Sequence, residues 1–283
     1  MFEKVLVPTD FSTHSQRVLE CVAYCPGIKE VVLVNAVMAD WMGAPISTLD
    51  ELEASLDEEK RFLQEARKDG PFEVKSRLEV GVGRNVVRAL RRVADEEGVS
   101  LVMMGARGKS LIQGILLGNV AKDMLQYDDT DLLILRYEML EGHEASDFCS
   151  RIFSRVLIPI DFSEPCSQAV AKIRKIEGLT EAVLVHVVSE GETSEQIEMR
   201  VKRAEEVLSL LAGDLERQGI KTTYHVLRGS PAEEIKALAR VEKATTIAMS
   251  SLGAGMLKHA LGSTTYEVVR QADRPVLVVR PRG

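Results

Sequence analysis

The chain has 283 residues, enough for two domains of ordinary size. Its composition, with 45% hydrophobic and 28% charged residues, is typical of a globular protein. The formal net charge of −7 argues against nucleic acid as a partner, because a nucleic-acid surface is normally basic. The sequence has no apolar run of the roughly 18–20 residues that cross a bilayer and no signal peptide at its start. We therefore expect a cytoplasmic protein without a membrane partner.

An internal repeat divides the chain. Residues 2–12, FEKVLVPTDFS, align with residues 153–163, FSRVLIPIDFS, and seven of these eleven positions are identical. The repeat predicts a duplicated domain. We expect copy one at residues 1–140 and copy two at residues 151–283, joined by a polar linker at residues 141–150.

Within each copy, short apolar segments alternate with longer amphipathic segments, the pattern of strands and helices in a parallel sheet. In copy one we expect strands near 3–8, 31–37, 72–80, 100–105 and 131–136, and helices near 13–25, 49–68, 84–97 and 115–127. In copy two we expect strands near 155–160, 181–188, 220–228, 245–250 and 275–280, and helices near 164–177, 194–218, 231–243 and 257–271. This α/β alternation predicts two doubly wound sheets with helices on both faces, which bind ligands at the carboxyl ends of their strands.

The residues after the first strand of each copy are candidates for contact with a ligand. Asp10 stands there in copy one and Asp161 in copy two. An aspartate at this place can accept a hydrogen bond from a ribose hydroxyl or a base amine. The alternative role is to cap the following helix, which we assign to Ser12 and Ser163.

A glycine pattern, G-x2-G-x9-G, follows the fourth predicted strand of copy one at Gly105, Gly108 and Gly118. Glycine lets the backbone approach a ligand closely, and a helix that begins near Gly118 presents free N–H groups to a phosphate. The segment GKS at residues 108–110 is not a P-loop, because that motif needs a glycine where Met103 stands. The alternative to a phosphate site is a simple flexible loop.

Together, the strand leading into PTDFS, the second strand ending in Asn or His, and the late glycine pattern resemble the universal stress protein family, in its tandem nucleotide-binding branch. The resemblance covers both copies almost end to end. It implies five-stranded parallel sheets of order 3-2-1-4-5. It also implies an adenine nucleotide as ligand, ATP or AMP, with or without Mg²⁺, and a regulatory role in the stress response.

The resemblance implies the following nucleotide-binding residues. Those of copy one are Pro8, Thr9, Asp10 and Ala36 around adenine and ribose, Met104, Gly105 and Gly108 in the glycine loop, and Gly118, Asn119 and Val120 at the phosphates. Those of copy two are Pro159, Ile160, Asp161, Val187, Met249, Gly253, Gly262, Ser263 and Thr264. Asn119 stands where the family has Ser or Thr, which changes the phosphate geometry. In copy two, Ser250 replaces the first loop glycine and the loop is one residue shorter, which reshapes or closes its phosphate end.

The sequence shows no general base paired with a nucleophile near the expected phosphates, so we expect no catalytic residues and no fast reaction. The alternatives are a slow ATP hydrolase of the related α-hydrolase-like fold and a dimerisation module that binds no ligand. ATP pyrophosphatases of related fold carry a glycine-rich loop where this chain has residues 8–12. A phosphoacceptor would need an aspartate at the end of the third strand, where the sequence reads EVG at residues 79–81.

The cysteines lack the spacing of a zinc site, and we expect buried or idle thiols in a reducing compartment at Cys21, Cys25, Cys149 and Cys166. The acidic stretch at residues 50–65 is expected to be the solvated face of a helix, and His186 a hydrogen-bonded histidine at the edge of the core.

The last strand of each copy contains four consecutive apolar residues and would lie at a sheet edge, which proteins normally cover. We therefore expect the two copies to pair along these strands as a pseudo-dimer within one chain. A homodimer of the whole chain is the open alternative.

Overall fold

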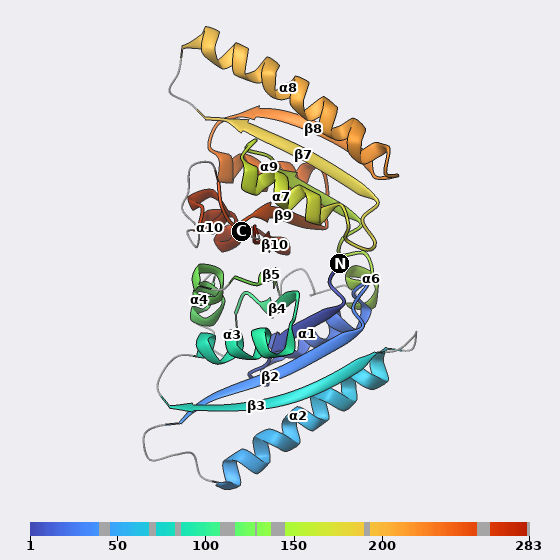
Figure 1. Ribbon diagram of the computed structural model, residues 1–283, viewed down its shortest axis with the longest axis vertical. Coiled ribbons are helices and arrows are strands. Elements are labelled where there is room, and N and C mark those ends of the chain that lie inside the picture. Colours follow the sequence, from blue (N-terminus) through green and yellow to red (C-terminus); the bar gives the residue numbers. More distant parts are fainter. Residues whose placement is uncertain are drawn as a thin grey trace. The chain divides into compact units, whose positions relative to one another are not determined.

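The computed structural model describes residues 1–39, 46–67, 72–82, 86–107, 117–127, 129–136, 145–189, 193–253 and 261–281 (Figure 1). The chain forms two compact units, Met1–Ser150 and Arg151–Gly283. The first unit contains copy one, and the second unit is copy two. Each unit is an α/β fold of parallel strands and covering helices, as predicted.

The elements of the first unit are β1 (Lys4–Pro8), α1 (Thr13–Tyr24), β2 (Glu30–Ala39), α2 (Ile46–Ala66), β3 (Glu73–Val82), α3 (Val86–Glu97), β4 (Leu101–Gly105), α4 (Asn119–Tyr127), β5 (Asp131–Leu135) and α6 (Ala145–Cys149). The strands are parallel and lie side by side in the order β3-β2-β1-β4-β5. The predicted order 3-2-1-4-5 is therefore confirmed for copy one.

The elements of the second unit are β6 (Arg155–Pro159), α7 (Glu164–Ile173), β7 (Glu181–Val188), α8 (Ser194–Glu216), β8 (Lys221–Arg228), α9 (Pro231–Val241), β9 (Thr246–Ser250), α10 (Ser263–Gln271) and β10 (Val276–Val279). Their strands repeat the arrangement in the order β8-β7-β6-β9-β10, again all parallel. The order 3-2-1-4-5 thus holds for copy two as well. The last helix begins at Ser263 rather than near 257, because Gly262 before it has extended backbone and forms the N-cap.

The helices of each unit cover both faces of its sheet (Figure 1). In the first unit α1 packs against α2, whereas α3 packs against α4 on the opposite face. Because both faces are covered, the central strands are apolar throughout, and Leu6, Val102 and Leu133 are completely buried. Burial of each leucine contributes about 1.5–3 kcal/mol, so the core fixes the strands whose carboxyl ends carry the candidate site.

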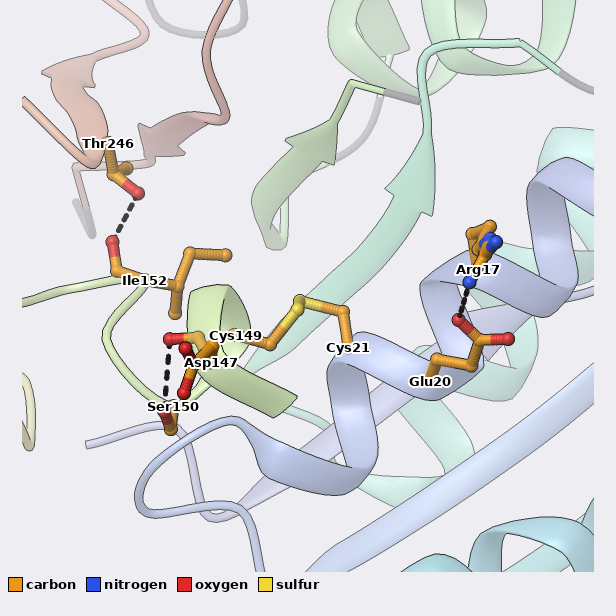
Figure 2. The surroundings of a disulfide bond; sticks show 8 residues. All are labelled: Arg17, Glu20, Cys21, Asp147, Cys149, Ser150, Ile152 and Thr246. Atoms are coloured by element: carbon orange, nitrogen blue, oxygen red, sulfur yellow. Dashed lines mark hydrogen bonds and ion pairs between the residues drawn. A yellow bond between two sulfur atoms is a disulfide. The ribbon is translucent and has the colours of Figure 1, made fainter. Parts of the chain in front are cut away.

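A disulfide in the first unit corrects the expectation of idle thiols. Figure 2 shows Cys21 of α1 joined to Cys149 of α6, two residues 128 positions apart in the chain. Cys25 and Cys166 are free and buried. Residues 145–149, expected as part of the linker, therefore form a short helix that is covalently tied to α1. The sequence did not indicate this pair, because it depends on α6 packing against α1 in the folded chain.

Within the described parts of the chain, no helix is both long and apolar enough to cross a bilayer. The same residues contain no cluster of three or more His, Cys, Asp or Glu side chains that could hold a metal ion.

Candidate functional site

A cavity of about 390 Å³ opens at the carboxyl ends of the strands of copy one, and we call it the first strand-end cavity. Its lining comes from the ends of β1, β2 and β4 and from the first turns of α3 and α4. It includes Pro8, Thr9, Asp10, Ala36, Met104, Gly105, Gly118, Asn119 and Val120. The structure thus brings together these residues, which the sequence analysis named for copy one. Gly108, the remaining one, lies outside the described residues.

The turn between β1 and α1 has the same unusual backbone in both copies. Phe11 and Phe162 adopt left-handed φ values of 58° and 60°, which are uncommon for residues other than glycine. In copy one the Asp10 carboxylate accepts a hydrogen bond from the Ser12 N–H at 3.1 Å, which stabilises this turn. The Ser12 hydroxyl then accepts from the N–H of Ser15 at 3.2 Å. The predicted caps at Ser12 and its counterpart Ser163 are therefore confirmed.

A buried polar cluster holds Thr9 at the floor of the first strand-end cavity. The Asn35 amide donates a hydrogen bond to the Thr9 carbonyl at 2.8 Å, which ties the end of β2 to the turn after β1. The Thr9 hydroxyl lies 3.0 Å from a carboxylate oxygen of Glu59 on α2, and it accepts a hydrogen bond from the Phe11 N–H at 3.1 Å. Thr9 and Asn35 are both buried. The turn that carries Asp10 is therefore held from two sides.

Glu59 supports this site from behind through its contact with Thr9, and the sequence analysis missed it. The pKa of its carboxyl group is raised to about 7, mainly by burial and in smaller part by the nearby Asp10 charge, while the hydrogen bond from Thr9 opposes the rise. The expectation that residues 50–65 form only a solvated face is therefore wrong at this position. Leu56 and Leu63 are buried on the same helix, and their spacing around Glu59 was the signal that could have placed it on the inner face.

The two described glycines of the loop serve different purposes. A Cβ on Gly105 would meet the Arg107 carbonyl oxygen at 3.0 Å, so the turn after β4 itself favours glycine there. A Cβ on Gly118 would meet its nearest atom, the Ala106 carbonyl oxygen, at 3.5 Å, which is ordinary van der Waals contact. The protein around Gly118 therefore accommodates a methyl group. Glycine at this position keeps open the space of the cavity in front of the first turn of α4.

Copy two has a corresponding cavity of about 290 Å³, which we call the second strand-end cavity. Its lining includes Pro159, Ile160, Asp161, Val187, Met249, Gly253, Gly262, Ser263 and Thr264. These are the residues that the sequence analysis named for copy two, and they come from the same elements as in copy one. Both copies therefore bring their named and described residues to one cavity each.

The chemistry of the second strand-end cavity differs from that of the first. Ile160 replaces the hydroxyl of Thr9, and Nδ1 of His186 lies 2.7 Å from the Ile160 carbonyl oxygen, where copy one has the amide of Asn35. The His186 ring also lies against the Phe162 ring, with centroids 4.5 Å apart. The prediction of a hydrogen-bonded histidine at the edge of the core is thus confirmed. Burial raises the pKa of the Cys166 thiol to about 12, so this side chain is no nucleophile at neutral pH.

These observations define a tandem α/β protein whose two doubly wound sheets each carry a ligand-sized cavity at the switch point of strand order. The model of the universal stress protein family matches residues 1–136 and again residues 153–280. The chain belongs to this family, and it contains two such domains.

Similar proteins include single-domain and full-length relatives. Universal stress proteins MJ0577 and MJ0531 of Methanocaldococcus jannaschii are each 29% identical to this chain, over 160 and 161 residues. The alignments cover 47% and 53% of this chain, and 99% and 94% of the relatives. The crystal structure of a universal stress protein from Archaeoglobus fulgidus covers 99% of both chains, with a TM-score of 0.72 and 24% identity. This likeness shows that the tandem fold is shared over its whole length.

Proposed function

We propose that this universal stress protein binds an adenine nucleotide in its first strand-end cavity and acts as a regulatory sensor without fast catalysis. The observation that carries the proposal is the convergence of the β1, β2 and β4 ends and the α4 start on one cavity. Its volume of about 390 Å³ falls within the roughly 300–1,000 Å³ of small-molecule sites.

The lining of the cavity suits each part of an adenine nucleotide. Apolar side chains, among them Val34, Leu90 and Met104, offer surface to a purine ring. One oxygen of Asp10 holds the turn, and an ionised carboxylate has further lone pairs with which to accept hydrogen bonds from ribose hydroxyls. The first turn of α4 presents backbone N–H groups and the positive end of the helix dipole to phosphates. Arg107, also in the lining, adds a positive charge.

The same proposal covers copy two, with Asp161 for the ribose and the first turn of α10 for phosphate. Three further points stay predictions. They are Mg²⁺ as a companion of the ligand, pairing of the copies along their last strands or a homodimer of the chain, and a cytoplasmic location. A slow ATP hydrolase is the alternative function. The Cys166 thiol is neutral, and the Asp10 carboxylate is used to hold the turn after β1. Both observations favour binding over catalysis.

Calorimetry of the whole chain with ATP, ADP and AMP tests the proposal, together with mass spectrometry of any ligand released on denaturation. The proposal expects saturable binding of an adenine nucleotide that is weakened in Asp10→Ala. A matched control is Asp57→Ala, which removes an exposed carboxylate of α2. Absence of binding by all three nucleotides, or equal affinity in Asp10→Ala, would contradict the proposal.

A further inference from the structure

The two strand-end cavities differ in size and in the groups around the end where the phosphates would lie. The second cavity is the smaller one, at about 290 Å³ against about 390 Å³ for the first. We propose that copy one takes a nucleoside triphosphate, whereas copy two takes a nucleoside monophosphate. The inference rests on the proposed function, because it assigns ligand classes to the sites which that function assumes.

The first difference lies in the turn after the fourth strand of each copy. In copy two the Ser250 hydroxyl accepts a hydrogen bond from the Leu252 N–H at 3.2 Å. That N–H group is therefore committed within the protein and is not offered to a phosphate. The corresponding residue in copy one is Gly105, which has no side chain to engage the N–H of Arg107 in this way.

The second difference is the charge at the start of the helix that follows the third strand. Leu90 of α3 and Ile235 of α9 line the two cavities at matching positions. Two residues before them stand Arg88 in copy one and Glu233 in copy two, and Glu234 follows where copy one has an uncharged alanine. These two positions carry a formal charge of +1 in copy one and −2 in copy two. These side chains do not line the two strand-end cavities, so they act at longer range, where additional phosphate charge is favoured in copy one and opposed in copy two.

An ion pair in copy two offsets part of this contrast in formal charge. Lys236 forms an ion pair with Glu233 at 2.8 Å, and it is itself buried. The matching residue of copy one is Arg91, which is also basic and forms an ion pair with Asp129. A basic residue therefore stands at this position in both copies, and the difference at the helix start remains.

A third observation concerns copy one alone, the room beyond the first turn of α4. A groove of about 700 Å³ runs between α3 and α4, and it shares Val86, Asn119 and Val120 with the first strand-end cavity. Arg88 lines this groove. The acidic side chains of the groove lie a helical turn or more farther along, at Asp95, Glu96 and Asp123. A chain of phosphates that leaves the first turn of α4 can therefore continue beside Arg88.

Copy two nevertheless retains the parts needed for one phosphate. Gly262 forms the N-cap of α10 without a side-chain capping bond, so the first-turn N–H groups of the helix keep their capacity for an anion. The side chains of Ser263 and Thr264 line the cavity beside them and bring hydroxyl donors. These groups suit a single phosphate at the helix N-terminus.

The experiment isolates copy two within the whole chain. Gly118→Val removes the space in front of α4, and calorimetry then reports binding of AMP and ATP by copy two. We expect AMP to bind at least about tenfold more tightly than ATP. Adding Ser250→Gly, Glu233→Arg and Glu234→Ala, which introduce the residues of copy one, should improve ATP binding relative to AMP by about tenfold. The matched control adds Glu198→Arg and Glu205→Ala on exposed positions of α8, with the same change in charge and no expected effect.

The outcomes separate this inference from the proposed function. The inference would be overturned if Gly118→Val prefers ATP, binds AMP and ATP equally, or binds neither nucleotide. In each of these cases, ATP binding by the unaltered chain would leave the proposed function intact. An unchanged preference after the three transplanted residues would overturn it too. If Gly118→Val does not fold, Asp10→Ala serves as the second way to silence copy one. Failure of the unaltered chain to bind any adenine nucleotide would contradict both the inference and the proposed function.

Discussion

Replacing Glu59 with glutamine should make the stability of the protein less dependent on pH. Glutamine keeps an oxygen that accepts the hydrogen bond from the Thr9 hydroxyl, but the glutamine side chain cannot ionise. In the native protein burial raises the pKa of Glu59 from 4.5 to about 7, so folding is favoured while the group is protonated. This stabilisation is fully present below pH 4.5 and is lost as the pH rises through about 7. The native protein should therefore lose stability between pH 5 and pH 8 relative to the variant.

The pKa rise sets the size of the effect. A rise from 4.5 to about 7 corresponds to at most about 3 kcal/mol at 1.36 kcal/mol per pKa unit. Because Glu59 is only partly buried, solvent screening should reduce this to about 1–2 kcal/mol. Urea denaturation of both proteins at pH 5 and pH 8 measures the difference. Glu65→Gln, the same change at an exposed position of α2 that does not contribute to the Glu59 pKa rise, is the control.

The reasoning about Glu59 would be refuted by one result. If the free-energy difference between the native protein and Glu59→Gln is the same at pH 5 and pH 8, the carboxyl group does not titrate near neutral pH. Loss of pH dependence in Glu65→Gln as well would assign the effect to the general charge of α2 instead.

Three further predictions concern the fold and its chemistry. Cys149→Ala should lower the free energy of unfolding by as much as about 5 kcal/mol, because it removes a crosslink between residues 128 apart. Reductant should lower the free energy of unfolding of the native protein to that of the variant. Four titratable thiols in the denatured, unreduced protein would contradict the pairing of Cys21 with Cys149. Ser163→Ala should cost about 1 kcal/mol in the same assay, because the Cys166 N–H loses its cap, and no change would contradict that role. Steady-state ATP turnover should stay far below the enzyme median of about 10 per second, and a faster rate abolished by Asp10→Ala would overturn the regulatory proposal.

The fold could be predicted because its signals are local. The nearly continuous apolar strands, such as residues 131–135, and the amphipathic segments between them indicate a parallel sheet covered on both faces. Once the strand order is fixed, topology places the strand ends together. Asp10, Met104 and Gly118 therefore meet at one cavity even though they are far apart in the sequence.

The features that the sequence did not yield depend on how separate elements pack. Glu59 becomes part of the site only because α2 turns its Leu56 and Leu63 side toward the core. Cys149 reaches Cys21 because α6 returns to α1 across 128 residues. The long-range contact of the two cysteines is not encoded in a local pattern of residue types, whereas the spacing of Leu56 and Leu63 around Glu59 is a local signal that the sequence analysis did not use.

The central claim is that copy one binds an adenine nucleotide across the strand ends and the first turn of α4. Calorimetric titration of Gly118→Val with ATP and AMP, beside the native chain, tests it most directly. The nearest protein atom lies 3.5 Å from a Cβ at Gly118, so the first carbon of the new side chain fits, and the melting temperature of the variant checks that it folds. The account predicts at least about a tenfold loss of affinity for the nucleotide that copy one binds, equivalent to about 1.4 kcal/mol. A folded Gly118→Val protein that binds both nucleotides as tightly as the native chain would contradict the account.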